Sequence, residues 1–288
     1  MPKTRLLRSG SHFPDPGAPV SIVRQRPQAP IRAHRHEFVE IVLILSGSGK
    51  HKTGIIRHDI RAGDVLVIHG GRSHAYEDTK SLHLVNVLVR RPVLDDAASR
   101  LGGLSGYHPL FTFEFARWRL GDFRGLLRLN PSDLKKASAW VDAIEEEVWH
   151  GTESAYFLAQ SWLMLLLGLL ARNYGKDQAV SPCLDMRMGR VLSEIDRDPT
   201  GRFPLEELAA RASMSPRSFL RYFKTATGFS PADYVIRSRI RRAEEMLVRD
   251  DEKLQVTEVA FRCGFNDSNY FSRQFRRVTG KSPRSYRR

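Results

Sequence analysis

The sequence predicts a multidomain α+β protein, with an all-β domain first and an all-α domain last. Strand-length apolar runs separated by turn residues fill residues 20–92. From Ser132 the apolar residues recur at the helical period, and beyond residue 186 short helices follow one another and repeat. The 288 residues, 41% hydrophobic and 27% charged, suffice for two ordinary globular domains, which excludes disordered and fibrous classes.

The strand signals are three runs and one alternation. FVEIVLILSGSG (38–49), RAGDVLVIHGG (61–71) and LHLVNVLVRRP (82–92) are rich in β-branched and aliphatic residues and end at glycine or proline. LFTFEF (110–115) alternates phenylalanine with polar residues and predicts one more strand.

Helical periodicity begins where the strands stop. Leu134, Val141, Ile144 and Val148 mark one helix, and residues 155–173 form a second, very apolar one. The domain division we expect is a loose, proline- and glycine-containing arm (1–19), a β domain (20–130), a helical segment (131–175), a linker (176–185) and a helical domain (186–288).

No targeting or membrane segment is expected. The start is basic but develops no long apolar core, and the longest apolar stretch, residues 162–170, is far shorter than the roughly 20 residues that span a bilayer. Cys183 and Cys263 form no disulfide framework and no metal-binding CxxC pair, which suits a reducing compartment. We therefore expect a cytoplasmic protein without a membrane anchor.

The charge points to a polyanionic partner. The formal net charge is +14, and residues 202–288 alone carry 19 Lys and Arg against 10 Asp and Glu. Such a concentration of positive charge attracts phosphate chains. All ten histidines, in contrast, lie at or before His150, so the two parts of the chain have different chemistry.

The carboxyl-terminal part contains an internal duplication. Residues 205–211 (LEELAAR) recur 51 residues later in 256–262, and residues 221–231 recur 52 residues later in 273–283. The offset changes by one between the paired helices, so the second turn is predicted to be one residue longer. A duplicated helix-turn-helix follows, with Pro231–Arg249 as a connecting helix of about 28 Å at 1.5 Å per residue. Its length would allow one chain to enter two successive major-groove segments.

The second helix of each pair is predicted to read DNA. The aromatic residues Phe219, Tyr222 and Phe223, and likewise Tyr270, Phe271 and Phe275, fall at core spacing. The residues predicted to face outward are Arg217, Leu220, Arg221 and Lys224 in the first motif and Ser268, Asn269, Ser272, Arg273 and Arg276 in the second. Arginine can grip guanine and asparagine adenine through paired hydrogen bonds. A solvated basic surface is the alternative, but it does not predict two matching helix pairs.

These residues resemble a known family. ARASMSPRSFLRYFKTATGFSPADYVIRSRIRRAEEML followed by VTEVAFRCGFNDSNYFSRQFRRVTGKSPRSYR is similar to the DNA-binding domain of AraC-type transcription regulators. The resemblance implies groove contacts at the positions just given. One departure is Ser213, where the first turn often has glycine. Its counterpart Gly264 is intact, so a strained but tolerated first turn is expected.

The β domain contains a cluster of potential ligands. His34, His36 and Glu40 share parity, so on one strand they would converge on one face. Together with Gly47, Gly63, Gly71 and His74, they resemble the two motifs of the cupin barrel, which implies His34, His36, Glu40 and His74 as metal ligands. His69 and Asp78 depart from the usual proline and asparagine of the second motif.

Three interpretations of this cluster stay open. The side chains can bind a small effector such as a sugar or organic acid without metal; they can hold Zn, Mn, Fe or Ni; or some are packed structural histidines. No cofactor is therefore assigned, although a divalent metal in the cupin-like pocket is one alternative. His51, His58 and His108 have no partners in this pattern and are predicted at the surface.

Residues 31–92 are more similar to the rhamnose-responsive regulators of the AraC family than to its arabinose-binding members, which implies a sugar effector. The resemblance also implies a dimerisation role for the helices at 131–175, and the apolar surplus at 162–170 favours a homodimer over a lid on the barrel.

The sequence therefore predicts a transcription regulator, an activator, that binds promoter DNA and a small effector, works with RNA polymerase and is not an enzyme. One rival is a metal-dependent cupin enzyme fused to a DNA-binding module. A second is a nonspecific DNA-packaging protein, which would show little preference between sequences.

Overall fold

The computed structural model describes residues 5–113, 125–177, 184–248 and 254–287. The chain divides into two compact units, residues 1–181 (unit 1) and residues 182–288 (unit 2). We describe each unit by itself.

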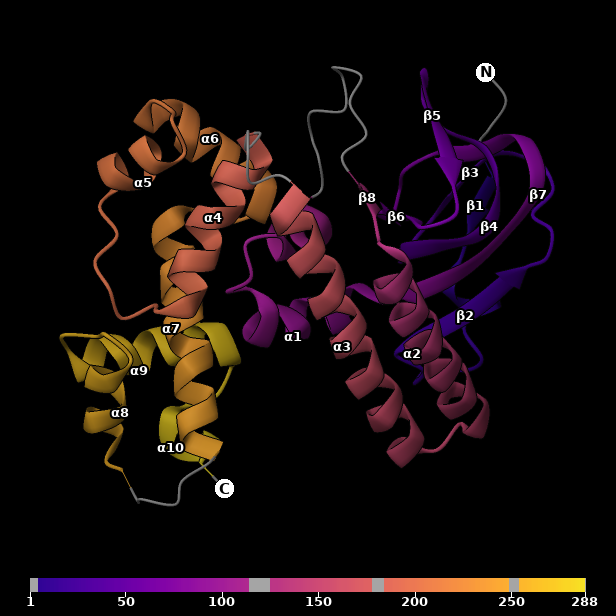
Figure 1. Cartoon of the computed structure of the whole chain (residues 1–288). Helices are drawn as coiled ribbons and strands as arrows, with labels where there is room; N and C mark the ends of the chain where they lie inside the picture. Colours follow the sequence, from indigo (N-terminus) through magenta and orange to yellow (C-terminus); the bar gives the residue numbers. More distant parts are fainter. Residues whose placement is uncertain (1–4, 114–124, 178–183, 249–253, 288) are drawn as a thin grey trace. The chain divides into compact units, whose positions relative to one another are not determined.

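Unit 1 is built on one eight-stranded, strongly curved sheet (Figure 1). Its path is β1-β3-β7-β4-β6-β8, while β2 pairs with β7 and β5 with β4. All pairs are antiparallel except β1 with β3. The strands are β1 (Arg5–Leu7), β2 (Val20–Gln25), β3 (Ile31–His36), β4 (Val39–Thr53), β5 (Ile56–Arg61), β6 (Asp64–Ile68), β7 (His74–Val89) and β8 (Leu126–Arg128).

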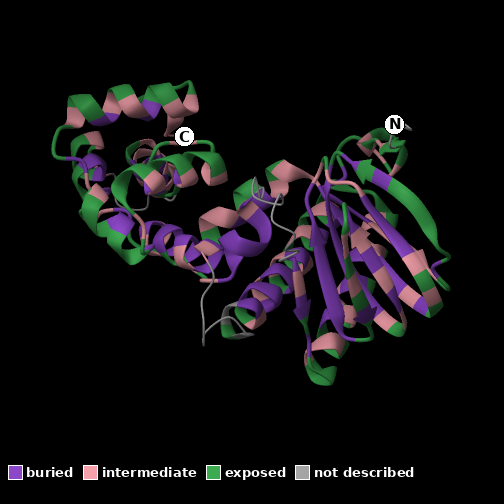
Figure 2. Cartoon of the chain, turned by 90° about the horizontal axis from the view of Figure 1, so that it is seen from above, coloured by how far each residue is buried: buried purple, intermediate pink, exposed green. Residues whose placement is uncertain are grey.

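The long strands β4 and β7 form the centre of the barrel. Their ladder runs from Val39 opposite Val89 to Thr53 opposite His74, with register shifts between Ile44 and Lys50. The three runs predicted as strands lie in β4, β6 and β7, and their apolar residues are buried (Figure 2). One core cluster comprises Val42, Ile44, Ile60, Leu66, Ile68, Tyr76, Leu82 and Leu84.

Two expectations about unit 1 were wrong. The described part of the amino-terminal arm is not loose, because β1 pairs with β3 and Phe13 packs against Phe38. The strand predicted at 110–115 is also absent where the chain is described. His108–Thr112 (η2) forms one π-helical turn, closed by a bond from the Phe113 amide to the His108 carbonyl. Phe111 and Phe113 are buried, whereas Phe115 lies outside the described residues.

Three helices accompany the barrel. They are α1 (Arg91–Leu101), which the sequence analysis missed, α2 (Pro131–His150) and α3 (Glu153–Asp177). Pro131 opens α2, and the Asn130 side chain accepts a hydrogen bond from the Asp133 amide. Arg24 on β2 donates to Asp142 and Glu145, and so anchors α2 to the barrel.

The long helix α3 is more apolar than expected. By length and composition alone its segment Glu153–Tyr174 could cross a membrane, which corrects the expectation from the nine-residue stretch. However, the core helix of a soluble protein passes the same test. Leu163, Leu166, Leu167 and Leu170 are buried within unit 1, so this segment behaves as a core helix on that side.

Unit 2 is entirely helical where it is described. Its helices are α4 (Leu184–Arg197), α5 (Leu205–Arg211), α6 (Pro216–Thr227), α7 (Pro231–Val248), α8 (Val256–Arg262), α9 (Ser268–Thr279) and α10 (Pro283–Tyr286). The sequence analysis missed α4. The predicted duplication is confirmed as two helix pairs, α5–α6 and α8–α9, on either side of α7.

The turns of the two motifs differ as predicted. Residues 212–215 separate α5 from α6, while residues 263–267, one residue more, separate α8 from α9. Ser213 adopts φ +54°, the left-handed conformation that Gly264 adopts at +85° in the second motif. The first turn therefore forms with serine where glycine is sterically favoured.

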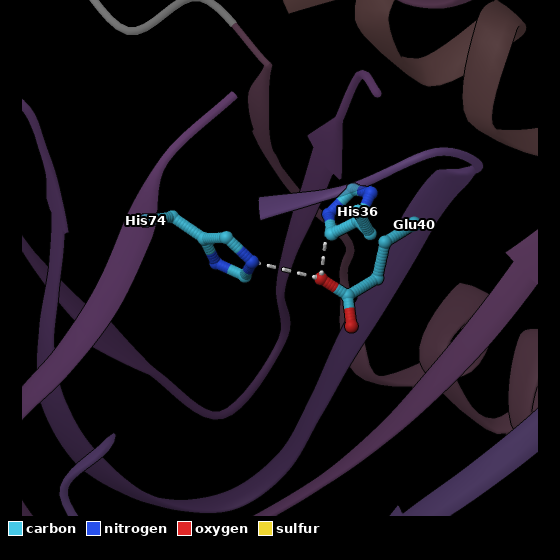
Figure 3. Close-up of side chains that lie close together, drawn as sticks. All are labelled: His36, Glu40 and His74. Atoms are coloured by element: carbon cyan, nitrogen blue, oxygen red, sulfur yellow. Dashed lines mark ion pairs between the residues drawn. The ribbon is translucent and has the colours of Figure 1, made fainter. Parts of the chain in front are cut away.

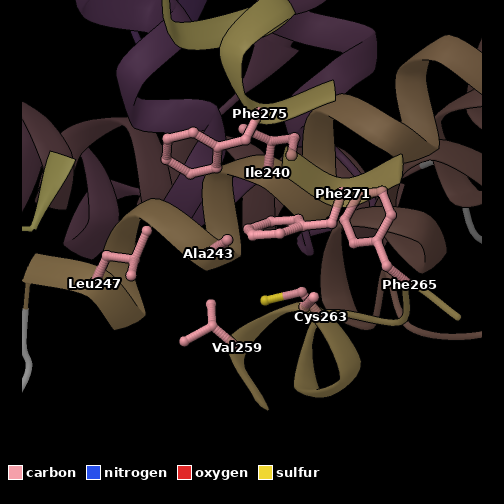
Figure 4. Packing of buried hydrophobic residues seen from close by; sticks show 9 residues of the cluster. Ile240, Ala243, Leu247, Val259, Cys263, Phe265, Phe271 and Phe275 are labelled. Atoms are coloured by element: carbon pink, nitrogen blue, oxygen red, sulfur yellow. The ribbon is translucent and has the colours of Figure 1, made fainter. Parts of the chain in front are cut away.

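A separate core holds the second motif together (Figure 4). Ile240, Ala243 and Leu247 of α7 pack against Val259 and Cys263, and Phe271 and Phe275 of α9 close the cluster. Because Phe271 and Phe275 of α9 point into this core, the opposite side of that helix faces outward.

Candidate functional site

Two buried histidines and one carboxylate meet inside unit 1 (Figure 3). Glu40 Oε2 lies 3.5 Å from His36 Nε2 and 3.4 Å from His74 Nε2. One ligand atom from each residue lies within 4.8 Å of the others, and all three residues are buried. These three belong to the set predicted from the sequence.

The fourth predicted residue, His34, lies beside the group rather than in it. Its ring packs on the His74 ring at 4.3 Å between centroids, and its Nδ1 bonds to the Arg32 carbonyl. The expected single strand is also wrong, because β3 ends at His36 and β4 begins at Val39. Glu40 therefore reaches the cluster from β4, which follows β3 in the chain but is separated from it in the sheet by β7.

Hydrogen bonding decides which histidine nitrogen faces the carboxylate. The Nδ1 of His36 bonds to the Phe38 carbonyl at 2.6 Å, which requires a proton on Nδ1. In neutral His36 the Nε2 lone pair then faces Glu40 Oε2, so two acceptors point at each other. A proton on Nε2 or a cation between the groups would relieve this repulsion.

Burial governs the protonation of the cluster. Burial lowers the pKa of His74 to about 3, although the charge of Glu40 opposes the shift. Burial by itself raises the pKa of Glu40, but the interactions of its carboxyl group with the imidazoles of His36, His74 and His34 outweigh burial, and the net pKa lies below its ordinary value. The group therefore favours an ionised carboxylate beside a neutral His74.

Unfulfilled hydrogen-bonding capacity surrounds this cluster. Both ring nitrogens of His74, the Tyr76 hydroxyl and the Thr53 hydroxyl are buried and have no hydrogen-bond partner among the described residues. Burial raises the pKa of Tyr76 well above its ordinary value, so the phenol keeps its proton and can donate. These groups suit a polar ligand or a metal, since leaving them unpaired is unfavourable.

His74 and Tyr76 also line a pocket of about 550 Å³. Its wall includes Arg32 and Lys52, and Lys52 pairs with Glu77 at 3.0 Å. The remaining lining residues are Pro30, Ile31, Ala33, Gly54, Ser73, Ala75 and Glu77. A volume of this order is typical of sites for small organic ligands.

The prediction that His51 and His108 lie at the surface was wrong. Both are buried, and His58, opposite His51 in the β4–β5 ladder, is half-buried. Burial lowers the pKa of His51 to about 3. Its ring packs 5.5 Å from both His74 and Tyr76, so it belongs to the wall of the cluster. Its position opposite Tyr76 in the ladder could be recognised only once the pairing of β4 and β7 was known.

The first helix pair of unit 2 presents a basic face. Ser215 caps α6, its side chain accepting from the Ser218 amide, and Gly228 ends the helix at φ +79°. Phe219 and Phe223 are fully buried, whereas Arg217, Leu220, Arg221 and Lys224 are exposed on the opposite face. These four outward positions are those predicted.

The second pair agrees except at one aromatic residue. Asn269, Arg273 and Arg276 of α9 are exposed, and Ser268 and Ser272 are half-buried. Tyr270, which the spacing predicted in the core, is 39% exposed. The centroid of its ring lies 6.2 Å from that of the buried Phe265 and 6.0 Å from the guanidinium of the exposed Arg273, so Tyr270 borders the outward face. Tyr222 of α6 is half-buried, and its hydroxyl bonds to Asp185.

A barrel with a polar ligand cluster, joined to a duplicated helix-turn-helix, defines the class of ligand-controlled DNA-binding regulators. Residues 19–146 match the AraC-like ligand binding domain, and residues 208–288 match a helix-turn-helix domain. The chain is 33% identical over 282 residues to an "HTH-type transcriptional activator RhaS" of Citrobacter koseri, covering 98% of this chain and 96% of that protein. It therefore belongs to the AraC family of transcription regulators.

The chain is also similar to two further proteins. The RhaS activator of Enterobacter sp. strain 638 is 32% identical over 282 residues, again covering 98% of this chain and 96% of that protein. Among solved structures, the DNA-binding domain of AdpA in complex with a target DNA is 38% identical. It matches 35% of this chain and 89% of that chain, with a TM-score of 0.33.

Proposed function

We propose that this regulator is a cytoplasmic transcription activator that recognises a promoter sequence with α6 and α9 and responds to a sugar bound in unit 1. The observation that carries the proposal is the pairing, in one chain, of a buried polar cluster beside a small-molecule-sized pocket with two matching outward basic helix faces. Its relatives named as transcriptional activators support the direction of regulation.

In this proposal the effector site comprises His34, His36, Glu40 and His74. Sugar hydroxyls donate to Glu40 and to the Nε2 lone pair of His36, accept from Tyr76, and bond to the two nitrogens of His74 in either sense, which satisfies groups that otherwise stay unpaired. A deoxyhexose is the class we favour, because the lining includes apolar groups beside the polar ones. Thermal-shift screening of monosaccharides tests this, and stabilisation only by another class of metabolite would contradict it.

The proposed DNA contacts are the nine outward residues of α6 and α9. Arg221→Ala and Arg273→Ala should each weaken binding to the specific site by about 1–3 kcal/mol if the guanidinium groups read bases. Footprinting upstream of the neighbouring genes, with and without candidate sugars, would locate that site. Equal losses on random duplex would show phosphate contact only, and no preference over scrambled DNA would favour nonspecific packaging.

A homodimer acting with RNA polymerase completes the proposal. Unit 1 displays an apolar strip on α3 in which Phe157 is 70% and Leu165 49% exposed, on the side away from its buried leucines. A twofold interface buries the same strip of both copies. The effector acts through its different affinity for two states of the dimer, and so changes how the helix pairs are presented to the promoter.

A metal-dependent function is the second candidate, favoured by the facing acceptors of His36 and Glu40. His36, Glu40 and His74 would hold a divalent transition metal, since two imidazoles and one carboxylate are a donor set that such metals accept and their ligand atoms lie within 4.8 Å of one another. Such a metal would supply Lewis acidity, and the neutral His74 and ionised Glu40 suit ligation. Metal analysis of the purified protein discriminates the two: stoichiometric metal together with catalytic turnover would favour an enzyme over a regulator without catalytic activity.

A further inference from the structure

The recognition face of α6 contains one large apolar residue. Leu220 is 40% exposed, while its neighbours in sequence and on the same face, Arg217, Arg221 and Lys224, are charged. The buried residues of the helix, Phe219 and Phe223, occupy the opposite face. Leu220 is therefore displayed to solvent among cations rather than packed in the core, and covering it with an apolar group of a bound partner would be favourable.

The duplicated motif provides an internal comparison at this position. With the offset of 52 residues, Arg217, Leu220, Arg221 and Lys224 correspond to Asn269, Ser272, Arg273 and Arg276. Ser272 is half-buried, and its hydroxyl donates to the Ser268 carbonyl one turn earlier at 2.9 Å. The two motifs thus share the arginine at positions 221 and 273 but differ at the residue before it. That residue is a leucine in α6 and, in α9, a serine whose hydroxyl bonds to its own helix.

Base edges in the major groove offer few apolar partners. They present hydrogen-bond donors and acceptors, and thymine adds its 5-methyl group, which apolar side chains contact. When the arginines beside Leu220 bind bases or phosphates, the Leu220 side chain would be placed against the base edges.

We propose that Leu220 recognises a thymine methyl group in the half-site bound by α6, and that α9 makes no equivalent contact. This inference rests on the proposed binding of promoter DNA by the two helices. It assigns the two halves of the site different chemistry: binding of one half depends on a single methyl group and binding of the other does not.

The test removes methyl groups one at a time. A duplex that the full-length protein selects from a random library is resynthesised with each thymine in turn replaced by deoxyuridine, which pairs identically but lacks the methyl. We expect one replacement, within the half-site bound by α6, to weaken binding about three- to fivefold, the effect of losing one buried methylene-sized contact. Binding of the other duplexes should stay unchanged.

Variants assign the effect to the residue. Leu220→Ala should bind the thymine and deoxyuridine duplexes equally, and its circular dichroism melting curve should match the wild type because Leu220 is outside the core. Phe261→Ala, which removes an exposed apolar side chain of α8 outside the proposed DNA contacts, is the matched control and should keep the wild-type sensitivity to that one methyl. A Leu220→Ala protein that stays sensitive to the same thymine, or a wild type insensitive to all replacements, would overturn the inference.

The outcome separates this inference from the proposed function. If selection enriches a sequence but deoxyuridine has no effect, the promoter-binding proposal stands and the role of Leu220 falls. In that case Leu220 is available for a protein partner instead. If selection enriches no sequence, the promoter-binding proposal itself fails, and the inference fails with it.

Discussion

At the scale of single residues, His69 shows how burial makes stability depend on pH. Its Nε2 bonds to the Leu110 carbonyl at 2.9 Å inside unit 1. Burial, together with the charges of Arg91 and Arg72, lowers its pKa to about 4, although the Leu110 bond opposes the shift. The ordinary histidine pKa is near 6.5, so between these values the unfolded chain takes up a proton that the folded chain excludes.

The sign of the effect follows directly. Stability is full above pH 6.5 and is lost as the pH falls toward 4, because protonation favours the unfolded state. His69→Gln keeps a donor but cannot titrate, so its free energy of unfolding should fall less steeply with decreasing pH, by up to about 1.4 kcal/mol per pH unit.

Urea unfolding followed by tryptophan fluorescence measures the free energy of unfolding of unit 1, since all four tryptophans lie before residue 181. His150→Gln, which removes an exposed histidine, is the matched control. Parallel pH profiles of wild type and His69→Gln would contradict a buried, neutral His69.

The turn residue Ser213 carries the second prediction. Its φ of +54° is unfavourable for serine, so Ser213→Gly should stabilise unit 2 by about 0.5–1 kcal/mol despite the added chain entropy of glycine. Gly264→Ala, the reverse change in the other turn, should destabilise by more, because a Cβ there would lie 2.7 Å from Thr200 Cα. Hydrogen exchange of peptides from α5 and α8 measures both effects, and faster exchange of α5 in Ser213→Gly would contradict the first.

At the scale of elements, α3 combines two different faces. One packs inside unit 1, and the other exposes Phe157, Leu158 and Leu165, which recur at helical spacing along the outer side. A charged residue can be introduced into this exposed strip without disturbing the core of unit 1.

Leu165→Lys should convert the dimer into a monomer. The twofold symmetry places two lysine side chains in the interface, and burying their unpaired ammonium groups is strongly unfavourable. Sedimentation velocity at micromolar concentration measures the state. Arg172→Lys, an exposed and conservative change on the same helix, is the control. A wild type that sediments as a monomer would count against the proposed interface.

Some helices and strands could be predicted from the sequence, and others could not. The helix pairs of unit 2 were predictable because proline, serine and glycine punctuate them and the duplication repeats that punctuation. Residues 110–115 were wrongly predicted as a strand because phenylalanine and polar residues alternate there. In the structure, Pro109 and the burial of Phe111 and Phe113 stabilise a helical turn instead. Tyr270 was misplaced because a single aromatic residue at the edge of a helical stripe can belong to either face.

The site in unit 1 was predictable in identity but not in geometry. His36, Glu40 and His74 stood out by their motif, yet the separation of Glu40 onto β4 and the burial of His51 depend on strand pairing between distant segments. Pairing register is a tertiary property, since one residue of slip reverses every side chain. Only the strand pairing in the folded structure shows which histidines lie together inside the barrel.

At the scale of the whole molecule, control of DNA binding by the effector is a thermodynamic coupling between units 1 and 2. If the sugar raises the affinity for the promoter by some factor, the promoter must raise the affinity for the sugar by the same factor. Couplings of this kind typically amount to about 5–150-fold. Calorimetric titration of the full chain with sugar, with and without the selected duplex, should therefore give the same ratio as titration with DNA, with and without sugar.

Substitutions in each unit should affect the two bindings separately. Arg273→Ala should weaken DNA binding but leave the sugar affinity of the DNA-free protein unchanged, because Arg273 lies in unit 2 and the proposed effector site in unit 1. Tyr76→Phe removes one buried donor and should weaken sugar binding while leaving the affinity for DNA unchanged without sugar. A ratio of one in both titrations, with sugar-dependent transcription intact, would place the control at the step of RNA polymerase rather than at the promoter.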